Sequence, residues 1–359
     1  MMSQNNESCK TLPAGRVSKV IQIHPSLNCN LRCKHCYSSS APGIKKELAF
    51  DALANIIGQA AEVGYNVISM SGGEPFMYQS LEELVRFSKS AGYFNSVTTN
   101  GMLLKGSRAK NILKYVDLIA VSIDGKEEMH DHMRSQPGAF KKMREGVAIL
   151  RDSINYGFIH TLLPDSWKIL SWLAGFAVDE KASLLHLHPL EMSGRATQHL
   201  GGLLFDQTDL YKIYISHYYL NTYFENDIFI QLDLLHRNNI KNNPNFVFHE
   251  SCKPQLCASG FSTIFKELII NEKGDILPIA HGCSPFFTIG NIYSGEKLQY
   301  MIGRFMHEKM GYIIDLFQAT YDNIMLDKEL EIVNWSEMVI QKSHTLFPKE
   351  QLLNTQPNQ

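Results

Sequence analysis

The chain has 359 residues, enough for about two domains of about 150 residues each. It carries 34 Lys and Arg and 36 Asp and Glu, so its formal net charge of −2 argues against a protein that binds nucleic acid through phosphates. An apolar share of 44% excludes a disordered or fibrous chain. Because the sequence has no apolar run of about 18 residues and no apolar segment near its start, we expect a cytoplasmic protein without a membrane or nucleic-acid partner.

Segments with strand character alternate with segments of helical periodicity over the first 200 residues. The expected strands are 20–24, 66–70, 95–99, 118–123, 158–163 and 184–188. The expected helices are 49–63, 81–91, 107–114, 140–152 and 167–177. Parallel strands joined by helices have right-handed crossovers, so this order predicts an α/β fold, a partial (β/α)6 barrel of the TIM type. Its active site should lie at the C-terminal ends of the strands.

The pattern changes after about residue 200. We expect, in order, a helix over 206–224, a strand over 228–232, a polar linker over 236–250, a hairpin over 261–279 and a mostly helical segment over 296–342. The predicted organisation is a flexible tail (1–16), the barrel (17–205), a connecting helix, strand and linker (206–250), and a smaller α+β domain with a helical tail (251–359).

Six of the seven cysteines fall into two groups of three, and Cys9 lies in the tail. Cys29, Cys33 and Cys36 directly follow the first strand with the spacing C-x3-C-x2-C. Three thiolates on one loop can bind three corners of a 4Fe–4S cluster and leave the fourth iron open. Zinc is the alternative, but it would need a fourth ligand, which His24 or His35 could supply. The triplet alone therefore leaves both metals open.

A second motif, Ser71-Gly72-Gly73-Glu74-Pro75, follows the second strand. Its two glycines would allow a ligand to approach the backbone closely. The cysteine triplet and this segment, in this order, resemble the radical S-adenosylmethionine (SAM) superfamily over roughly residues 18–200. The resemblance implies an iron–sulfur enzyme of the oxidoreductase or maturase type. In that family a 4Fe–4S cluster binds SAM and reduces it to a 5′-deoxyadenosyl radical, which takes a hydrogen atom from the substrate.

The resemblance also implies roles for single residues. It assigns Cys29, Cys33 and Cys36 to the catalytic cluster and Ser71, Gly72, Gly73 and Glu74 to the methionine ammonium group of SAM. The other residues expected to contact SAM follow strand ends or flank Cys36; they are His35, Tyr37, Thr99, Asn100, Ser122, Asp124, Arg134 and His188.

The stretch from Ser122 to Arg134 is similar to the peptide-modifying branch, in which the arginine pairs with the carboxylate of SAM. The alternatives are a solvated loop charge for Arg134 and a helix N-cap for Asp124. His186 and His188 alternate along one strand and so share a face. Either histidine, and Glu191, could contact SAM or the substrate, or serve only in packing.

The second cysteine group is Cys252, Cys257 and Cys283. With the hairpin between them, these residues are similar to the auxiliary-cluster domains called SPASM and twitch. The sequence departs from that pattern because Ile279, not a cysteine, follows Pro278. The three cysteines could hold one auxiliary 4Fe–4S cluster, with His281 as an unusual further ligand, or the domain could keep its shape without a cluster.

The leading hypothesis is a radical SAM enzyme that acts on a peptide or natural-product precursor. It would receive electrons from a reductase or a flavodoxin- or ferredoxin-type donor. A radical SAM enzyme of the molybdopterin or haem pathway is the enzymatic alternative. The non-enzyme alternative is a zinc-binding regulatory or interaction module, which would have no need of the segments after the second and fourth strands.

Overall fold

The computed structural model describes residues 17–151, 153–247 and 260–348. Its main feature is a ten-stranded sheet with the order β11-β10-β9-β1-β2-β3-β4-β5-β6-β7. Seven of its strands are mutually parallel and follow one another in chain order; they are β1 (Val20–Ile23), β2 (Val67–Met70), β3 (Phe94–Thr99), β4 (Leu118–Ser122), β5 (Tyr156–Leu162), β6 (Leu184–Pro189) and β7 (Phe229–Leu232). The predicted α/β architecture is confirmed, and the strand over 228–232 extends the parallel series by one.

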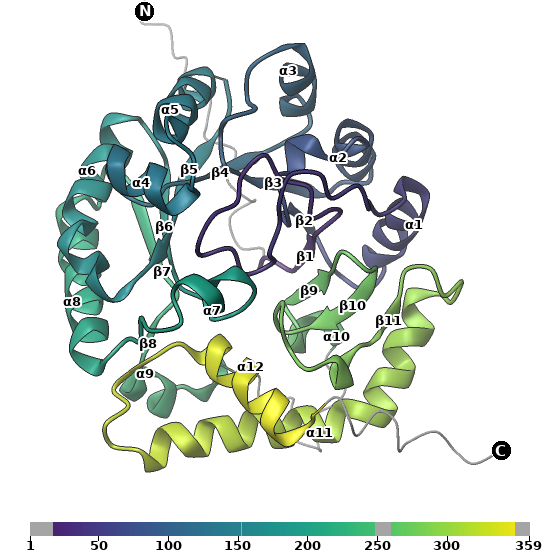
Figure 1. Ribbon diagram of the computed structural model, residues 1–359. Coiled ribbons are helices and arrows are strands. Elements are labelled where there is room, and N and C mark those ends of the chain that lie inside the picture. The colour runs from purple at the N-terminus through teal and green to yellow at the C-terminus, as the bar shows by residue number, and fades with distance from the viewer. Residues whose placement is uncertain (1–16, 152, 248–259, 349–359) are drawn as a thin grey trace, which may run out of the picture.

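The crossover helices cover the outside of the curved sheet (Figure 1). They are α1 (Phe50–Ala60), α2 (Leu81–Ser90), α3 (Ser107–Leu113), α5 (Ala139–Leu150), α6 (Leu170–Asp179) and α8 (Gln207–Tyr223). The apolar periodicity of α1 explains its packing, because Leu53, Ile56, Ile57 and Ala60 are the residues that it buries. The loop after β1 lies over the strand ends, at the centre of Figure 1.

Within the barrel, two short helices were not predicted, α4 (Glu127–Arg134) and α7 (Arg195–His199). Helix α4 is too polar to show an apolar period, and its buried residues are His130, Met133 and Arg134. Helix α7 is barely more than one turn long. Both follow strand ends, so they lie beside the loop after β1.

The predicted hairpin forms from β9 (Glu267–Ile270) and β10 (Asp275–Pro278), preceded by α10 (Phe261–Ile264) and followed by β11 (Gly290–Asn291). Strand β9 also pairs in parallel with β1, from Val20 opposite Glu267 to Ile23 opposite Ile270. The hairpin therefore continues the barrel sheet.

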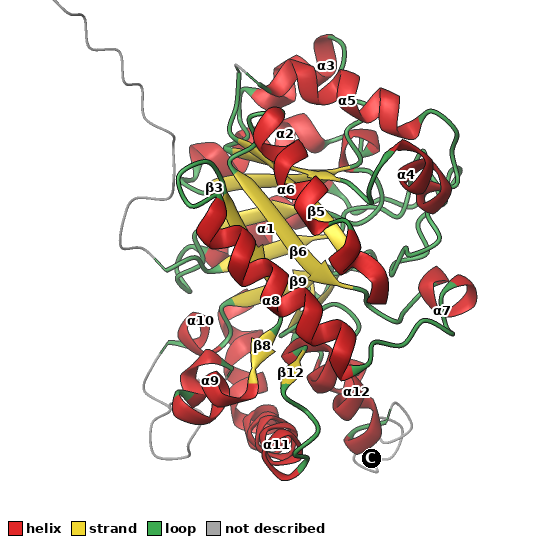
Figure 2. Ribbon diagram, turned by 90° about the vertical axis from the view of Figure 1, so that its left-hand side faces the viewer, coloured by secondary structure: helices red, strands yellow, loops and turns green. Residues whose placement is uncertain are grey.

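The last two helices are α11 (Leu298–Leu326) and α12 (Trp335–Leu346). Helix α11 runs from the hairpin side to α9 below the sheet (Figure 1) and is seen nearly end-on in Figure 2. Among the described residues, none of the helices has both the length and the apolar character needed to cross a lipid bilayer.

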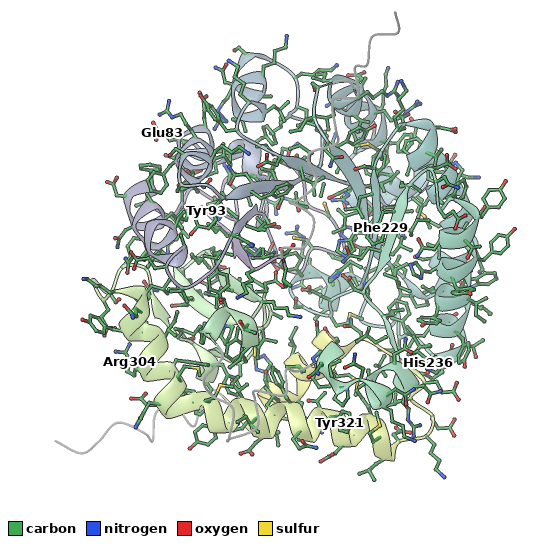
Figure 3. All side chains as sticks on the ribbon, turned by 180° about the vertical axis from the view of Figure 1, so that it is seen from behind. Glu83, Tyr93, Phe229, His236, Arg304 and Tyr321 are labelled. Atoms are coloured by element: carbon green, nitrogen blue, oxygen red, sulfur yellow. The ribbon has the colours of Figure 1, made fainter. Side chains whose placement is uncertain are left out.

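The prediction of a linker over 236–250 is wrong for the part that the structure describes. Strand β8 (Leu235–His236) pairs with β12 (Ile332–Val333), and α9 (Arg237–Asn242) follows, with a 3-10 turn at Pro244–Phe246. The His236 ring accepts a hydrogen bond from the Asn238 amide at 3.0 Å and so caps α9. Ile240 packs against Ile324 of α11. Figure 3 labels His236 at the start of α9 and Tyr321 on α11.

Candidate active site

Three cysteine thiols gather on the loop that follows β1. Cys29 and Cys33 are buried, Cys36 is half-buried, and all three are free thiols. Burial raises the pKa of Cys29 to about 12, and the nearby Glu74, Cys33 and Cys36 add to this increase. Thiols crowded in this way cannot all ionise unless a cation compensates their charge. The donor set and its burial therefore fit a positively charged iron–sulfur core.

Arg195 holds this cysteine loop from the other side of the barrel. Its Nε donates to the carbonyl of Cys33 at 3.0 Å and its Nη2 to the carbonyl of Ser40 at 2.5 Å. Its backbone amide donates to the carbonyl of Cys36 at 2.9 Å. The preceding Gly194 has a φ of +57°, and a Cβ there would lie 2.2 Å from the carbonyl oxygen of Tyr37. The contact of this Gly-Arg pair with the cysteine loop was not predicted from the sequence.

The glycine segment after β2 packs against the same loop. Gly72 has a φ of +100°, and a Cβ on Gly73 would lie 2.3 Å from the carbonyl oxygen of Asn28. The amides of Gly73 and Glu74 donate to the carbonyls of Ser26 and Asn28, both at 2.9 Å. The atoms next to the Cβ position of Gly73 belong to the cysteine loop, and a ligand close to the backbone of these glycines stays a prediction. Because glycine has no Cβ, the cysteine loop can pack directly against the backbone of this segment.

Glu74 joins the ends of β2 and β3. It is 2% exposed, its Oε1 accepts hydrogen bonds from Thr99 Oγ1 at 2.8 Å and from the Phe76 amide at 3.1 Å, and its Oε2 accepts one from the Asn100 amide at 2.9 Å. Burial raises its pKa, and these hydrogen bonds oppose that shift. The Asn100 side chain in turn donates to Asn30 of the cysteine loop at 2.8 Å. A carboxylate oxygen can accept two hydrogen bonds, so Oε2 can accept one more donor.

A buried ion pair lies on the other side of the cysteines. Arg134 donates through Nε to Asp124 Oδ2 at 2.5 Å and through Nη2 to Oδ1 at 3.1 Å. Its Nη1 lies 3.7 Å from the sulfur of Cys33. His35 Nε2 is 2.8 Å from Asp124 Oδ1. Burial opposes the ionisation of Asp124, but Arg134 and His35 outweigh it and hold the pKa of this carboxyl well below its usual range.

This pair corrects two interpretations of the sequence. Arg134 is 8% exposed, so it is not a solvated loop charge. Asp124 is not a helix cap, because α4 begins after Lys126 and Asp124 binds Arg134 instead. A guanidinium has two edges that can each bind a carboxylate. Asp124 occupies the Nε–Nη2 edge, and the Nη1–Nη2 edge lies beside Cys33.

Tyr37 connects the cysteine loop to the C-terminal hairpin. Its hydroxyl is 3.3 Å from His24 Nε2 and 3.5 Å from Ser71 Oγ. The ring of His24 stacks on that of His281 with centroids 4.7 Å apart, and His281 follows β10. Burial lowers the pKa of both histidines. Ser122, half-buried, ends β4 two residues before the buried ion pair.

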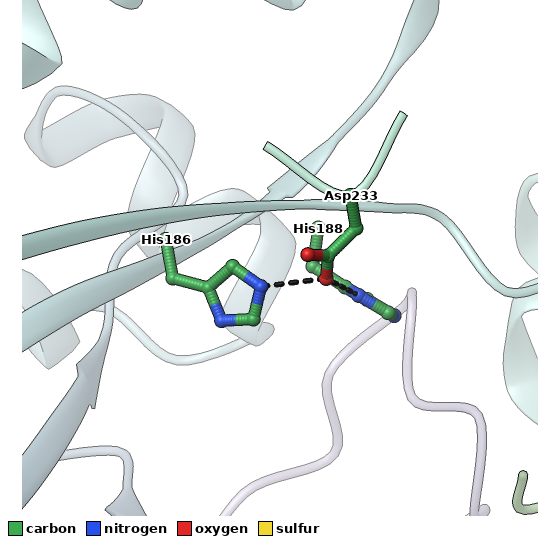
Figure 4. A group of neighbouring side chains, drawn as sticks. All are labelled: His186, His188 and Asp233. Carbon is green, nitrogen blue, oxygen red and sulfur yellow. Dashed lines mark hydrogen bonds and ion pairs between the residues drawn. The ribbon is translucent and has the colours of Figure 1, made fainter. Parts of the chain in front are cut away.

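His188 belongs to a separate polar group (Figure 4). Its Nδ1 is 2.8 Å from Asp233 Oδ2 and its Nε2 is 3.1 Å from Glu191 Oε1. His186 Nε2 reaches the same Asp233 oxygen at 2.6 Å. Burial opposes the protonation of His188, but Asp233 and Glu191 raise its pKa to about 10. The prediction that the two histidines share a face is confirmed, whereas Asp233 was not singled out because it lies 45 residues further along the chain.

The family model described as the radical SAM superfamily matches residues 23–170. That stretch contains the cysteine loop, the glycine segment and the Asp124–Arg134 pair. The chain thus contains a radical SAM domain over these residues. Proteins of this family use a 4Fe–4S cluster and SAM, as the sequence led us to expect.

Curated relatives match about half of this radical SAM protein or less. An AdoMet-dependent heme synthase of Oleidesulfovibrio alaskensis is 31% identical over 187 residues, which are 50% of this chain and 47% of that protein. A pre-heme d1 synthase of Dinoroseobacter shibae is 28% identical over 52% of this chain and 47% of its own. A GTP 3′,8-cyclase of Chlorobaculum tepidum is 32% identical over 33% and 38%. The chain thus spans about half or less of the length of these relatives.

Solved structures resemble a larger part of this radical SAM protein. SuiB of Streptococcus suis bound to S-adenosylmethionine matches with a TM-score of 0.61 and 17% identity, over 83% of this chain and 68% of SuiB. Native anSMEcpe with bound AdoMet and the Cp18Cys peptide matches with a TM-score of 0.61 and 15% identity, over 93% and 98%. At these identities the likeness concerns the fold, and it supports the partial barrel with its C-terminal extension.

The second cysteine group of this radical SAM protein is only partly described. Cys252 and Cys257 lie outside the described residues, and Cys283 is buried next to Ser343 of α12. Burial raises the pKa of Cys283 to about 11, and Ser343 and Ser284 oppose the shift. His281, two residues earlier, stacks on His24. Metal binding by this group stays a prediction.

Proposed function

We propose that this protein binds a 4Fe–4S cluster through Cys29, Cys33 and Cys36 and cleaves SAM reductively to start radical chemistry on a substrate. The observation that carries the proposal is the position of the three free thiols, on one loop held by Arg195 and packed against Gly73. When bound, the cluster would supply the electron that converts SAM to a 5′-deoxyadenosyl radical. The residues around it would hold and orient SAM.

Two charged side chains are suited to the methionine end of SAM. Glu74 is ionisable, and its Oε2 can accept a hydrogen bond from the ammonium group. Arg134 is fixed by Asp124 along one edge, so its other edge is oriented in advance for the SAM carboxylate. Glu74 approaches the cysteine loop from the segment after β2, and Arg134 from the C-terminal end of α4. Such an arrangement would hold both groups of SAM against the same loop.

The proposed substrate is a peptide or a natural-product precursor. In its favour, a TM-score of 0.57 relates this fold to SuiB bound to the precursor peptide SuiA, and anSMEcpe matches in a complex with a peptide. A tetrapyrrole of the haem pathway is the second candidate, because relatives include an AdoMet-dependent heme synthase and a Fe-coproporphyrin III synthase. Those matches cover about half of this chain.

The test is anaerobic production of 5′-deoxyadenosine. The reconstituted protein, given SAM and dithionite, should release 5′-deoxyadenosine, measured by mass spectrometry. The variant with Cys29, Cys33 and Cys36 all changed to Ala should release none, whereas Cys9→Ala, which removes a thiol outside both cysteine groups, should match the wild type. Undiminished production by the triple variant would refute the proposal. Iron retained by the triple variant, at about four atoms per chain, would support an auxiliary cluster at the second cysteine group.

The same assay addresses the substrate and the electron source. Fe-coproporphyrin III can be added to this assay. If it raises 5′-deoxyadenosine production and its own mass changes, the tetrapyrrole candidate is favoured over the peptide. We further propose a reducing, cytoplasmic setting for this protein, because the four cysteines in the described part of the chain are free thiols. There a flavodoxin or ferredoxin with its reductase would replace dithionite.

A further inference from the structure

We propose that His186, His188 and Asp233 form a second metal site, for one divalent transition-metal ion. This site is distinct from the cysteine loop and goes beyond the proposed SAM chemistry. One nitrogen of each ring and one oxygen of the carboxylate all lie within 4.8 Å of one another.

The parallel sheet brings the three side chains together. His186 and His188 are two residues apart on β6, so both project from the same face of that strand. Asp233 directly follows β7, the neighbouring strand, whose Leu232 lies beside Leu187. Figure 4 shows both rings reaching toward the Asp233 carboxylate. The ligands thus come from two hydrogen-bonded strands, which fix their spacing without any metal.

The group also has the outer partners that metal ligands require. A metal-bound imidazole usually donates its other ring N–H to a carboxylate. His188 faces Asp233 with Nδ1 and Glu191 with Nε2, at 2.8 and 3.1 Å. The second oxygen of Asp233 accepts a hydrogen bond from Gln231 at 3.1 Å.

The donor set and its exposure define the kind of ion. Two imidazoles and one carboxylate suit zinc or ferrous iron, and three protein ligands leave positions open for a substrate atom. The side chains of His186, His188 and Asp233 are 24, 33 and 30% exposed, so an ion can enter and exchange ligands. The site adjoins the cysteine loop, because Ser193, shortly after His188, donates to the Tyr37 carbonyl at 3.2 Å.

The competing interpretation is a hydrogen-bonded group without metal. The two ring nitrogens lie 2.6 and 2.8 Å from Asp233 Oδ2, whereas the ligands of a tetrahedral zinc ion, with bonds of about 2.0–2.2 Å, stand about 3.3–3.6 Å apart. The carboxylate would therefore have to move back by about 0.5–1 Å. Asp233 directly follows β7, and its backbone amide donates to the Leu187 carbonyl of β6 at 3.1 Å, so this movement has to come from its side chain.

Zinc binding to the reconstituted protein separates the two interpretations. We expect calorimetry with Zn²⁺ alone to show one ion per chain, and His186→Gln and Asp233→Asn to weaken binding at least tenfold. Glu191→Gln, which changes only the outer partner, should weaken it by about tenfold. Asp165→Asn is the matched control, because Asp165 is an exposed carboxylate on a different segment, paired with Lys168. Iron content and circular dichroism verify that each variant keeps its cluster and its fold.

X-ray absorption at the zinc edge identifies the ligands. Zinc at the proposed site should show only nitrogen and oxygen neighbours, at about 2.0–2.2 Å, and no sulfur at about 2.3 Å. Sulfur neighbours, or binding unchanged in both His186→Gln and Asp233→Asn, would overturn the proposal. So would a wild-type protein that binds no zinc. None of these readouts depends on SAM cleavage, so they leave the proposed function untouched.

Discussion

Replacing Arg134 with Lys should weaken SAM binding without loss of the cluster. Lys keeps the positive charge beside Asp124, so the variant avoids the cost of about 3–5 kcal/mol that an unpaired buried charge would add. It loses the planar fork that lets Arg134 bind Asp124 with Nε and Nη2 and still present a second edge. Losing one charge-assisted hydrogen bond to the SAM carboxylate costs about 1.5–3 kcal/mol, a roughly ten- to hundredfold rise in the SAM dissociation constant.

The assay is anaerobic calorimetry of SAM binding to reconstituted Arg134→Lys, with iron content measured on the same sample. Arg304→Lys is the control, because Arg304 makes a two-pronged pair with Glu296, at 2.6 and 2.8 Å, on the surface of α11. That change should leave SAM affinity at the wild-type value. Wild-type affinity in Arg134→Lys with full iron would show that the SAM carboxylate is held elsewhere, and the argument from the two edges would fail.

Three further perturbations test how the site is built. Arg195→Ala removes both side-chain hydrogen bonds to the cysteine loop, so its cluster should be lost to a chelator faster than that of the wild type, as followed by visible absorbance. Gly73→Ala would place a Cβ 2.3 Å from a backbone oxygen and should lower the iron content, whereas Gly58→Ala, with open space around it, should not. Asp124→Asn should destabilise the fold by about 3–5 kcal/mol at pH 7 in urea unfolding. The pKa of Asp124 is depressed in the folded protein, so its ionised form stabilises the fold above about pH 4. This contribution is lost as the pH falls further, so the free energies of unfolding of mutant and wild type should converge at low pH.

The spacing of apolar residues predicted the barrel, because the spacing that indicates a helix or a strand lies within a single segment of the chain. The buried residues of α1 and the alternating burial of β3 follow from spacing within one segment. The cysteine triplet and the glycine segment were equally visible, since each is a short run directly after a strand. The contact between these two segments was not visible in the sequence, because Gly73 packs against the carbonyl of Asn28, which lies 45 residues earlier in the chain.

Long-range pairing explains what the sequence did not reveal. The partner of Arg134 is Asp124, ten residues away across a helix that has no apolar period. Asp233 joins His186 and His188 only because β7 pairs with β6. The polar segment that was interpreted as a linker contains α9, whose single fully buried residue, Ile240, is held by α11. In each case the deciding contact comes from another part of the chain.

The pairing of β9 with β1 has a consequence for the order of assembly. Strand β1 carries the cysteine loop, and one of its two edges is completed by residues 267–270, about 250 positions later in the chain. During synthesis from the N-terminus, that edge stays open until the hairpin has left the ribosome. Contacts of such long sequence separation also form slowly. The strand that supports the cysteines therefore reaches its final form late, so iron delivery to this protein is best timed after translation has finished.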